Sequence, residues 1–164
     1  MKLDNEIAIR LASADDAGSV HSLIVDLAEA IGELHRVSSS VDDFRSALSG
    51  PNPGIHAFVV ERNLERIGVA IFFLSFSTWR GNWGVYLQDI YVRADSRGTG
   101  AGKVLLANVA AWGIERGADH LRLSVDGDNT TARSFYERSG MTFCSREMIY
   151  QISDDEFRQL GTES

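Results

Sequence analysis

A run of glycines beyond the middle of the chain has the residue types of an anion-binding loop. The apolar stretch 86–92 leads into Arg97-Gly98-Thr99-Gly100-Ala101-Gly102-Lys103, and an amphipathic stretch follows. This order predicts a strand, a tight loop and a helix. Glycine lets a ligand come close to the backbone, and the free N–H groups and dipole of a helix N-terminus attract negative charge. The stretch therefore predicts a site for a phosphorylated ligand.

Two common phosphate-binding motifs do not fit this loop. A P-loop requires Ser or Thr directly after its Gly-Lys pair, but Val104 follows Lys103. A dinucleotide fingerprint spaces its glycines by two and then three residues, whereas Gly98, Gly100 and Gly102 are spaced by two and two. Too little chain follows Gly102 for the repeated crossovers of a dinucleotide fold, so a dinucleotide-dependent oxidoreductase is disfavoured.

Length and composition indicate one globular domain over residues 1–164. The chain is 44% hydrophobic and 24% charged, and its formal net charge is −7. Nucleic-acid binding calls for a basic face, so this charge argues against a nucleic-acid partner. No apolar run reaches the roughly 20 residues that span a bilayer. The polar N-terminus lacks a signal-peptide pattern, and we expect a cytoplasmic protein with no membrane partner.

Cysteine and histidine usage indicates neither a disulfide framework nor a metal site. The single cysteine, Cys144, is expected to be a small buried residue on a strand. His21, His56 and His120 do not have the spacing of metal ligands, so we expect no metal.

Hydrophobic periodicity predicts an α+β order of elements. We expect strands over 6–11, 56–61, 67–76, 86–92, 121–125 and 141–152, and helices over 13–30, 41–48, 104–116 and 128–139, with a short helical tail at the C-terminus. A polar and aromatic break is expected over 77–84. An antiparallel first half followed by strand-helix-strand crossovers gives three layers: a mixed, mostly antiparallel central sheet with helices on both faces.

Three stretches carry a family resemblance. The pattern Arg97-x-x-Gly100-x-Gly102 after a strand, the Asp128-Asn129 turn before a helix, and Phe-Tyr-Glu-Arg-Ser-Gly over 135–140 resemble the Gcn5-related N-acetyltransferase (GNAT) superfamily. The resemblance covers nearly the whole chain. Ser77-Thr78-Trp79-x-Gly81, followed by the stretch 86–92, is similar to the diamine (spermidine/spermine) N-acetyltransferase branch, which includes thialysine acetyltransferases.

The resemblance implies a fold, a reaction and a cofactor. It implies the GNAT fold and an enzyme that transfers acetyl from acetyl-CoA to a primary amine of a small, polyamine- or lysine-like molecule, acting as a homodimer. Backbone N–H groups of the glycine loop would hold the pyrophosphate, and the strand before the loop would splay at a bulge and pair with the pantetheine. The positions implied for acetyl-CoA are Ile90, Tyr91, Val92, Arg97, Gly98, Thr99, Gly100, Ala101, Gly102, Lys103 and Asn129.

Several of these positions also have a purely structural interpretation. The amide near Ile90 would stabilise the oxyanion, and Asn129 would bind the pantetheine or only cap a helix. Tyr136 matches the family's general acid, because a phenol near pKa 10 stays protonated and can donate to a thiolate near 8.5. It could instead be a core aromatic residue.

One departure from the family affects the general base. The diamine enzymes carry Glu-Asp where this chain carries Gln88-Asp89, and an amide cannot accept the proton of the attacking amine. Two explanations stay open: Asp89, Glu29, Glu33 or His35 acts as the base through water, or the substrate amine is less basic than an ordinary alkylamine. Gln88 would then only hydrogen-bond substrate or water.

The acceptor side is less defined. Glu29, Glu33 and Trp79 are the candidate substrate contacts, although Trp79 and Trp83 could simply pack at a sheet edge or a subunit interface. Two alternatives stay open: a catalytically weakened acyl-CoA-binding module, suggested by Gln88, and acetylation of a protein or antibiotic amine.

Overall fold

The computed structural model describes residues 7–162, so the expected start of the first strand at Glu6 lies outside the described residues. The chain divides into two compact units, residues 1–124 and 125–164, and each is described here by itself.

The first unit is built on a central sheet. Its strands are β1 (Ile7–Leu11), β2 (His56–Arg62), β3 (Glu65–Ser77), β4 (Asn82–Val92) and β5 (Leu121–Leu123). The spatial order is β1-β2-β3-β4-β5. The first three pairings are antiparallel, and β4 pairs with β5 in parallel. The predicted mixed, mostly antiparallel sheet is confirmed.

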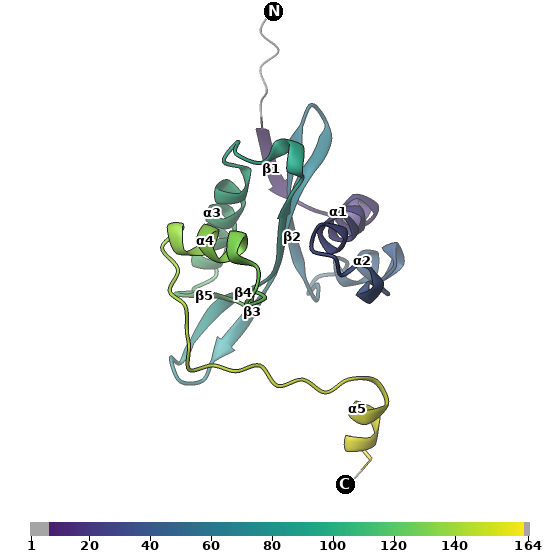
Figure 1. The fold of residues 1–164 in the computed structure, drawn as a ribbon, viewed down its shortest axis with the longest axis vertical. Coiled ribbons are helices and arrows are strands. Elements are labelled where there is room, and N and C mark those ends of the chain that lie inside the picture. Colours follow the sequence, from purple (N-terminus) through teal and green to yellow (C-terminus); the bar gives the residue numbers. More distant parts are fainter. Residues whose placement is uncertain (1–6, 163–164) are drawn as a thin grey trace, which may run out of the picture. The chain divides into compact units, whose positions relative to one another are not determined.

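Helices cover both faces of this sheet (Figure 1). One face carries α1 (Ala17–Ala30) and α2 (Val41–Ala47), and the opposite face carries α3 (Ala101–Ile114). Adjacent strand residues point to opposite faces. Ile71 accordingly packs in a buried cluster with Leu23 of α1, and the ring of Phe72 lies 4.9 Å from that of Trp112 in α3. The predicted three-layer arrangement is therefore present. Short 3-10 turns occupy Ala14–Asp16, Leu34–Arg36 and Ala94–Ser96.

A buried carboxylate fixes the start of α1 against the sheet. Asp16 accepts two hydrogen bonds of 2.8 Å from Arg10 of β1 and one of 2.9 Å from the backbone N–H of Ser13. Arg66 of β3 adds an ion pair at 3.4 Å. The hydrogen bonds from Arg10 hold the pKa of Asp16 well below its usual range. The helix on this face is thus attached to two strands by charge as well as by apolar packing.

The β3–β4 hairpin is longer than the sequence predicted. The residues from Asn82 to Gly84, expected in a break, continue β4 and pair with β3 as far as Ser77. Only residues 78–81 form the turn, where Gly81 has φ +64°. The prediction was wrong because a two-stranded ribbon needs backbone pairing and tolerates polar side chains where both faces meet solvent.

The second unit contains α4 (Thr130–Arg138) and α5 (Asp154–Leu160). The strand predicted over 141–152 is not formed, although all of these residues are described. Met148, Ile149 and Tyr150 are largely exposed, as is Cys144, which was expected to be buried. Apolar alternation favours a strand, but a strand exists only where a neighbour completes its backbone hydrogen bonds.

No helix among the described residues is long and apolar enough to cross a membrane.

Candidate active site

A bulge interrupts β4 at Gln88. Asp89 lies opposite Ile71 of β3, and the next pair is Leu87 opposite Phe72, so Gln88 is an extra residue without a partner in this register. Such a bulge bends the strand and reverses the alternation beyond it. The splayed strand implied by the family resemblance is therefore a feature of this chain.

The bulge determines which face each side chain joins. Leu87 is opposite Phe72 and is buried on the α3 face. Asp89 is opposite Ile71, and Tyr91 packs against the cluster under α1. Asp89 and Tyr91 therefore lie on the α1 face, although an unbroken strand would place them on the same face as Leu87.

The bulge also turns backbone groups toward the outer edge of β4. The N–H of Val85 donates to His120 on the β5 side, and the N–H of Arg93 donates to Ile67 of β3. Counting back from Arg93, the backbone groups of Ile90 and Val92 point away from β3. β5 pairs only with Val85, Tyr86 and Leu87 and ends at Leu123. The edge of β4 from Gln88 to Val92 is consequently not continued by β5.

The glycine loop follows this open edge directly. Gly98 and Gly100 have φ of +76° and +85°, and Gly100 is the N-cap of α3. The first bond of the helix runs from Val104 N–H to Gly100 C=O at 3.0 Å. The N–H groups of Ala101, Gly102 and Lys103 precede it and have no intrahelical acceptor. The loop thus presents free donors at the positive end of a helix dipole.

Side chains stabilise the shape of the loop without filling it. Thr99 Oγ1 donates to the carbonyl of Ser96 at 2.7 Å. Arg97 Nε donates to the carbonyl of Val92 at 3.2 Å, and the guanidinium lies 5.9 Å from the ring centre of Tyr91. A Cβ added at Gly98 or Gly100 would meet no atom within 4 Å. These glycines are therefore explained by their left-handed backbone and not by crowding from neighbouring atoms.

The two polar residues at the bulge differ in environment. Gln88 is exposed, whereas Asp89 is half-buried. Burial raises the pKa of the Asp89 carboxyl above its ordinary value, because a desolvated carboxylate is less stable than the neutral acid. Asp89 is thus a partly desolvated acid next to an open strand edge, which is an environment often found for groups that move protons.

The candidate substrate contacts are scattered along the first unit. Glu29 is exposed near the end of α1. Glu33 accepts from Arg36 at 3.3 Å and lies 3.9 Å from His35. Trp79 is 99% exposed at the hairpin turn. The first unit brings together Gln88, Asp89 and the backbone leading to the glycine loop. Within the described residues, no hydrogen bond or ion pair joins Glu29, Glu33 or Trp79 to that group.

Asn129 and Tyr136 belong to the second unit. Asn129 caps α4 by accepting from the Ala132 N–H at 3.1 Å, so its structural role is real. Capping uses the amide oxygen, and the amide NH₂ could still donate to a ligand. Tyr136 is half-buried on α4, with its ring centre 5.3 Å from that of Phe135.

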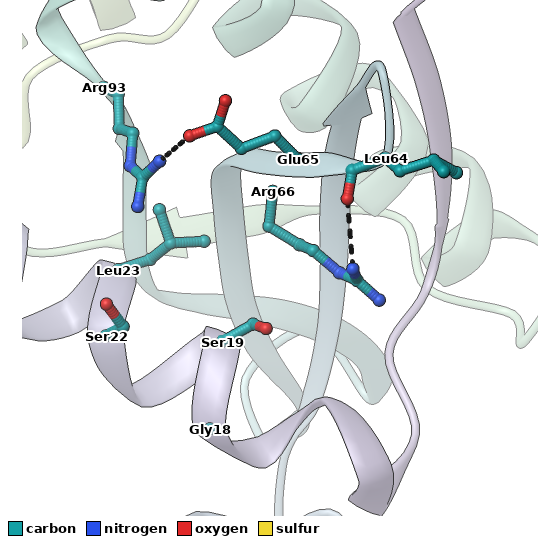
Figure 2. Close-up of a pocket in the computed structure, with 8 residues that line it drawn as sticks. All are labelled: Gly18, Ser19, Ser22, Leu23, Leu64, Glu65, Arg66 and Arg93. Carbon is teal, nitrogen blue, oxygen red and sulfur yellow. Dashed lines mark hydrogen bonds and ion pairs between the residues drawn. The ribbon is translucent and has the colours of Figure 1, made fainter.

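The first unit also contains a pocket whose lining residues do not include those of the bulge. It has a volume of about 370 Å³ and is lined by the first turns of α1, the start of β3 and Arg93 (Figure 2). Arg93 pairs with Glu65 at 2.5 Å and with Asp26 at 3.3 Å, and Arg66 donates to the carbonyl of Leu64 at 3.2 Å. Since its arginines are already engaged by acceptors of the protein, this hollow has no surplus charge for an anion.

Sequence reasoning missed one pair of side chains next to the bulge. The hydroxyl groups of Tyr86 and Ser124 lie 2.9 Å apart, although 38 positions separate the two residues. Only the parallel pairing of β4 with β5 brings them together, and no local pattern signals such a contact. Within the described residues there is also no group of three or more His, Cys, Asp or Glu that could hold a metal ion.

Residues 22–141 match the model of the acetyltransferase (GNAT) family, and the chain belongs to this family. Thialysine N-epsilon-acetyltransferase of Bos taurus is 32% identical over 142 residues, which cover 82% of this chain and 83% of the relative. The Mus musculus protein of the same name is 32% identical over 164 residues, covering 93% and 96%. The chain is therefore a GNAT acetyltransferase, which confirms the family and the class of enzyme that the motifs predicted.

Solved structures agree on the fold. An integron cassette protein from the mobile metagenome of V. cholerae superposes with a TM-score of 0.80 at 18% identity, covering 96% of this chain and 98% of the other. The aminoglycoside N-acetyltransferase AAC(6')-Iy, solved in complex with CoA, gives a TM-score of 0.75 at 18% identity, covering 93% and 98%. At these identities the likeness shows the GNAT fold alone.

Proposed function

We propose that this enzyme transfers the acetyl group of acetyl-CoA to a primary amine of a small polyamine- or lysine-like molecule. The observation that carries the proposal is the open edge of β4, which runs from the bulge at Gln88 to Val92 and into a glycine loop with free N–H donors. A ligand with an anionic end and an amide-containing arm fits this arrangement, in which unpaired backbone groups of a strand lead to free N–H donors in a loop. CoA has both, and it is the donor substrate of GNAT acetyltransferases.

Each part of the cofactor then has a partner in the first unit. The loop N–H groups from Arg97 to Lys103 bind the pyrophosphate, and the backbone of Ile90 and Val92 pairs with the pantetheine as an added strand. This order leaves the thioester next to the bulge. The N–H of Ile90 is the donor nearest to that position, and it stabilises the oxyanion of the tetrahedral intermediate.

Tyr136 supplies the proton that the leaving group needs. The amine nitrogen attacks the thioester carbonyl carbon, the carbon–sulfur bond breaks, and the thiolate takes the phenolic proton of Tyr136. Support comes from its Phe-Tyr-x-x-x-Gly setting and from the family match, which spans residues 22–141 and so includes both Asn129 and Tyr136. The same match extends across both units, which supports treating residues 1–164 as one GNAT domain.

Asp89 takes the proton of the attacking amine through water. Gln88 cannot do so at any useful pH. Glu33 is held by Arg36, and Glu29 is exposed, whereas Asp89 is half-buried beside the bulge. Burial raises the pKa of Asp89, which makes its carboxylate a better proton acceptor than an ordinary aspartate.

The proposed class of acceptor substrate is supported by the carboxylate beside the bulge and by the similarity to known relatives. A carboxylate beside the open edge favours a cationic substrate, and the Bos taurus and Mus musculus relatives that align over most of the chain are thialysine N-epsilon-acetyltransferases. A primary amine at the end of an aliphatic chain satisfies both. We also propose a homodimer, supported by exposed apolar side chains at Phe143, Met148 and Ile149, and light scattering coupled to size-exclusion chromatography tests it.

The test is an acetyl-transfer screen read by CoA release. The enzyme is incubated with acetyl-CoA and with polyamines, thialysine, lysine, amino acids or aminoglycosides, and binding of acetyl-CoA is followed separately by thermal shift. We expect stabilisation by acetyl-CoA and CoA release that depends on a lysine- or polyamine-like amine. Stabilisation without release for any amine would instead support the CoA-binding module suggested by Gln88.

A further inference from the structure

An aromatic pair that ends in two hydroxyl groups lies next to the bulge. Phe73 and Tyr86 are directly opposite in the β3–β4 ladder, with ring centres 5.3 Å apart and planes inclined by 25°. The Tyr86 hydroxyl lies 2.9 Å from the hydroxyl of Ser124. Both rings are half-buried, and Ser124 is exposed. The pairing of β2 with β3 stops at His56 opposite Phe72, so β2 does not extend alongside Phe73.

The pair lies on the same face of the sheet as Asp89. Phe73 follows Phe72, which packs on Trp112 of α3, so Phe73 points to the opposite face, and Tyr86 stacks on it there. Asp89 joins that face because of the bulge at Gln88. Without the extra residue, the Asp89 carboxylate and the pair of hydroxyl groups would lie on opposite faces of the sheet.

Only this face leaves room for an acceptor beside the thioester position. On the α3 face, Leu87 and Phe72 are fully buried, and Val85 fills the space beside Gly113, where an added Cβ would come within 2.4 Å of it. A substrate cannot enter through this packing. The acceptor therefore approaches over the face that carries Asp89, Tyr86 and Phe73.

We propose that Phe73, Tyr86 and Ser124 select acceptors that carry a second polar group, an inference that rests on the proposed function. The reacting nitrogen lies near Asp89, the aliphatic chain lies on the aromatic pair, and the second group hydrogen-bonds to the hydroxyls of Tyr86 and Ser124. Asp89 lies three steps along the strand from Tyr86, about 10 Å or less at roughly 3.3 Å per step, and the bulge shortens this span. A short aliphatic chain with polar groups at both ends matches it.

The test compares two acceptors that differ only in the second group. Diaminopentane and pentylamine have the same chain, and their kcat/KM ratio isolates recognition of the distal nitrogen. We expect wild-type enzyme to favour diaminopentane by about tenfold, the scale of one hydrogen bond. Tyr86→Phe and Ser124→Ala lower this ratio toward one and leave KM for acetyl-CoA unchanged. Tyr86→Phe keeps the ring stacked on Phe73, so folding is preserved.

The double variant and a control complete the design. Because the two hydroxyls act as one group, Tyr86→Phe combined with Ser124→Ala lowers the ratio no further than either change alone. Tyr150→Phe, at a 92% exposed tyrosine of the second unit, leaves the ratio as in wild type. Equal losses for both amines, or an unchanged ratio, would overturn the inference.

Failure of the inference is distinguishable from failure of the proposed function. If wild-type enzyme acetylates neither amine but acetylates thialysine or a polyamine, selection by the hydroxyl pair is wrong and acetyl transfer stands. If no amine of the larger screen releases CoA, both are wrong.

Discussion

Asp89 lies opposite Ile71 in the β3–β4 ladder, and the pair that follows is Leu87 opposite Phe72. One unmatched residue, Gln88, therefore places a carboxylate on the α1 face and turns the backbone of Ile90 and Val92 to the open edge of the sheet. Under the proposed function, this single irregularity accounts for both the route of the cofactor arm and the position of the proton acceptor.

Asp89→Asn should lower activity and raise stability together. Loss of the proton acceptor lowers kcat by about 10², the usual scale of acid–base catalysis. Burial raises the pKa of Asp89 in the folded state, so the stability that its neutral form supplies is complete below the ordinary pKa and is lost as pH rises through the folded value. At neutral pH the uncharged amide of the Asp89→Asn variant avoids this loss of stability, so the midpoint of its thermal unfolding is higher than that of wild type. A simultaneous fall in activity and midpoint would indicate a structural role instead.

The pH–rate profile should report the same carboxyl. Because Asp89 must be ionised to accept a proton, kcat/KM falls as pH drops through its pKa, and this limb lies at higher pH than for an ordinary aspartate. In Asp89→Asn the limb disappears from the residual activity. Persistence of the same limb would assign it to another group.

Tyr136→Phe should reduce turnover by about 10² or more without unfolding the protein. The substitution removes the hydroxyl group that donates the proton and leaves the ring in contact with Phe135, whose ring centre lies 5.3 Å away. Steady-state kinetics together with a melting curve provide the check, with Tyr150→Phe as the matched variant. A rate equal to wild type would remove Tyr136 from the mechanism.

Gly100→Ala should weaken acetyl-CoA binding by about tenfold. Its φ of +85° costs an L-residue about 1–2 kcal/mol, so the loop relaxes away from the shape that presents its N–H groups. Gly50→Ala is the matched control, since Gly50 has φ +88° and lies after α2. Both variants lose a similar amount of stability in denaturation, but only Gly100→Ala shows a raised dissociation constant in calorimetry. Equal affinities in the two variants would contradict a role for the loop.

Asp16→Ala should destabilise the first unit by about 2 kcal/mol, because Arg10 and Arg66 lose their buried acceptor while part of their charge stays solvated. The pKa of Asp16 is lowered in the folded state, so its contribution is present above the ordinary pKa and is lost as pH falls, opposite in sign to Asp89. Urea unfolding at two pH values measures the difference. Asp42→Ala, which removes an exposed pair with Arg45, serves as the comparison and should cost under about 1 kcal/mol.

Much of the fold could be read from local patterns. The helix over 17–30 shows apolar residues at spacings of three and four. The loop from Arg97 to Gly102 contains three glycines in alternate positions, a composition that few structures other than tight loops require. Asn129 was predicted at the start of α4, where it caps the helix. These features depend on residues close together in sequence, which is why a single chain is enough to find them.

The features that escaped prediction depend on pairing between distant strands. Gln88 gives no local sign of being the extra residue, because the bulge is a relation between β4 and β3. Tyr86 meets Ser124 only through the β4–β5 pairing. Residues 82–84 look like a loop and form a strand, while residues 141–152 look like a strand and form none. In each case, the structure depends on whether a second strand completes the backbone hydrogen bonds. The residues of one segment alone do not show which second strand that is, so no local pattern predicts it.

CoA release by wild-type enzyme and Tyr136→Phe, with acetyl-CoA and a thialysine, lysine or polyamine acceptor, tests the central claim most directly. We predict release by wild type that requires the amine, and a loss of about 10² in the variant, with acetyl-CoA binding equal in both. Tight binding of acetyl-CoA by wild type without amine-dependent release would contradict the assignment of acetyl transfer to this site.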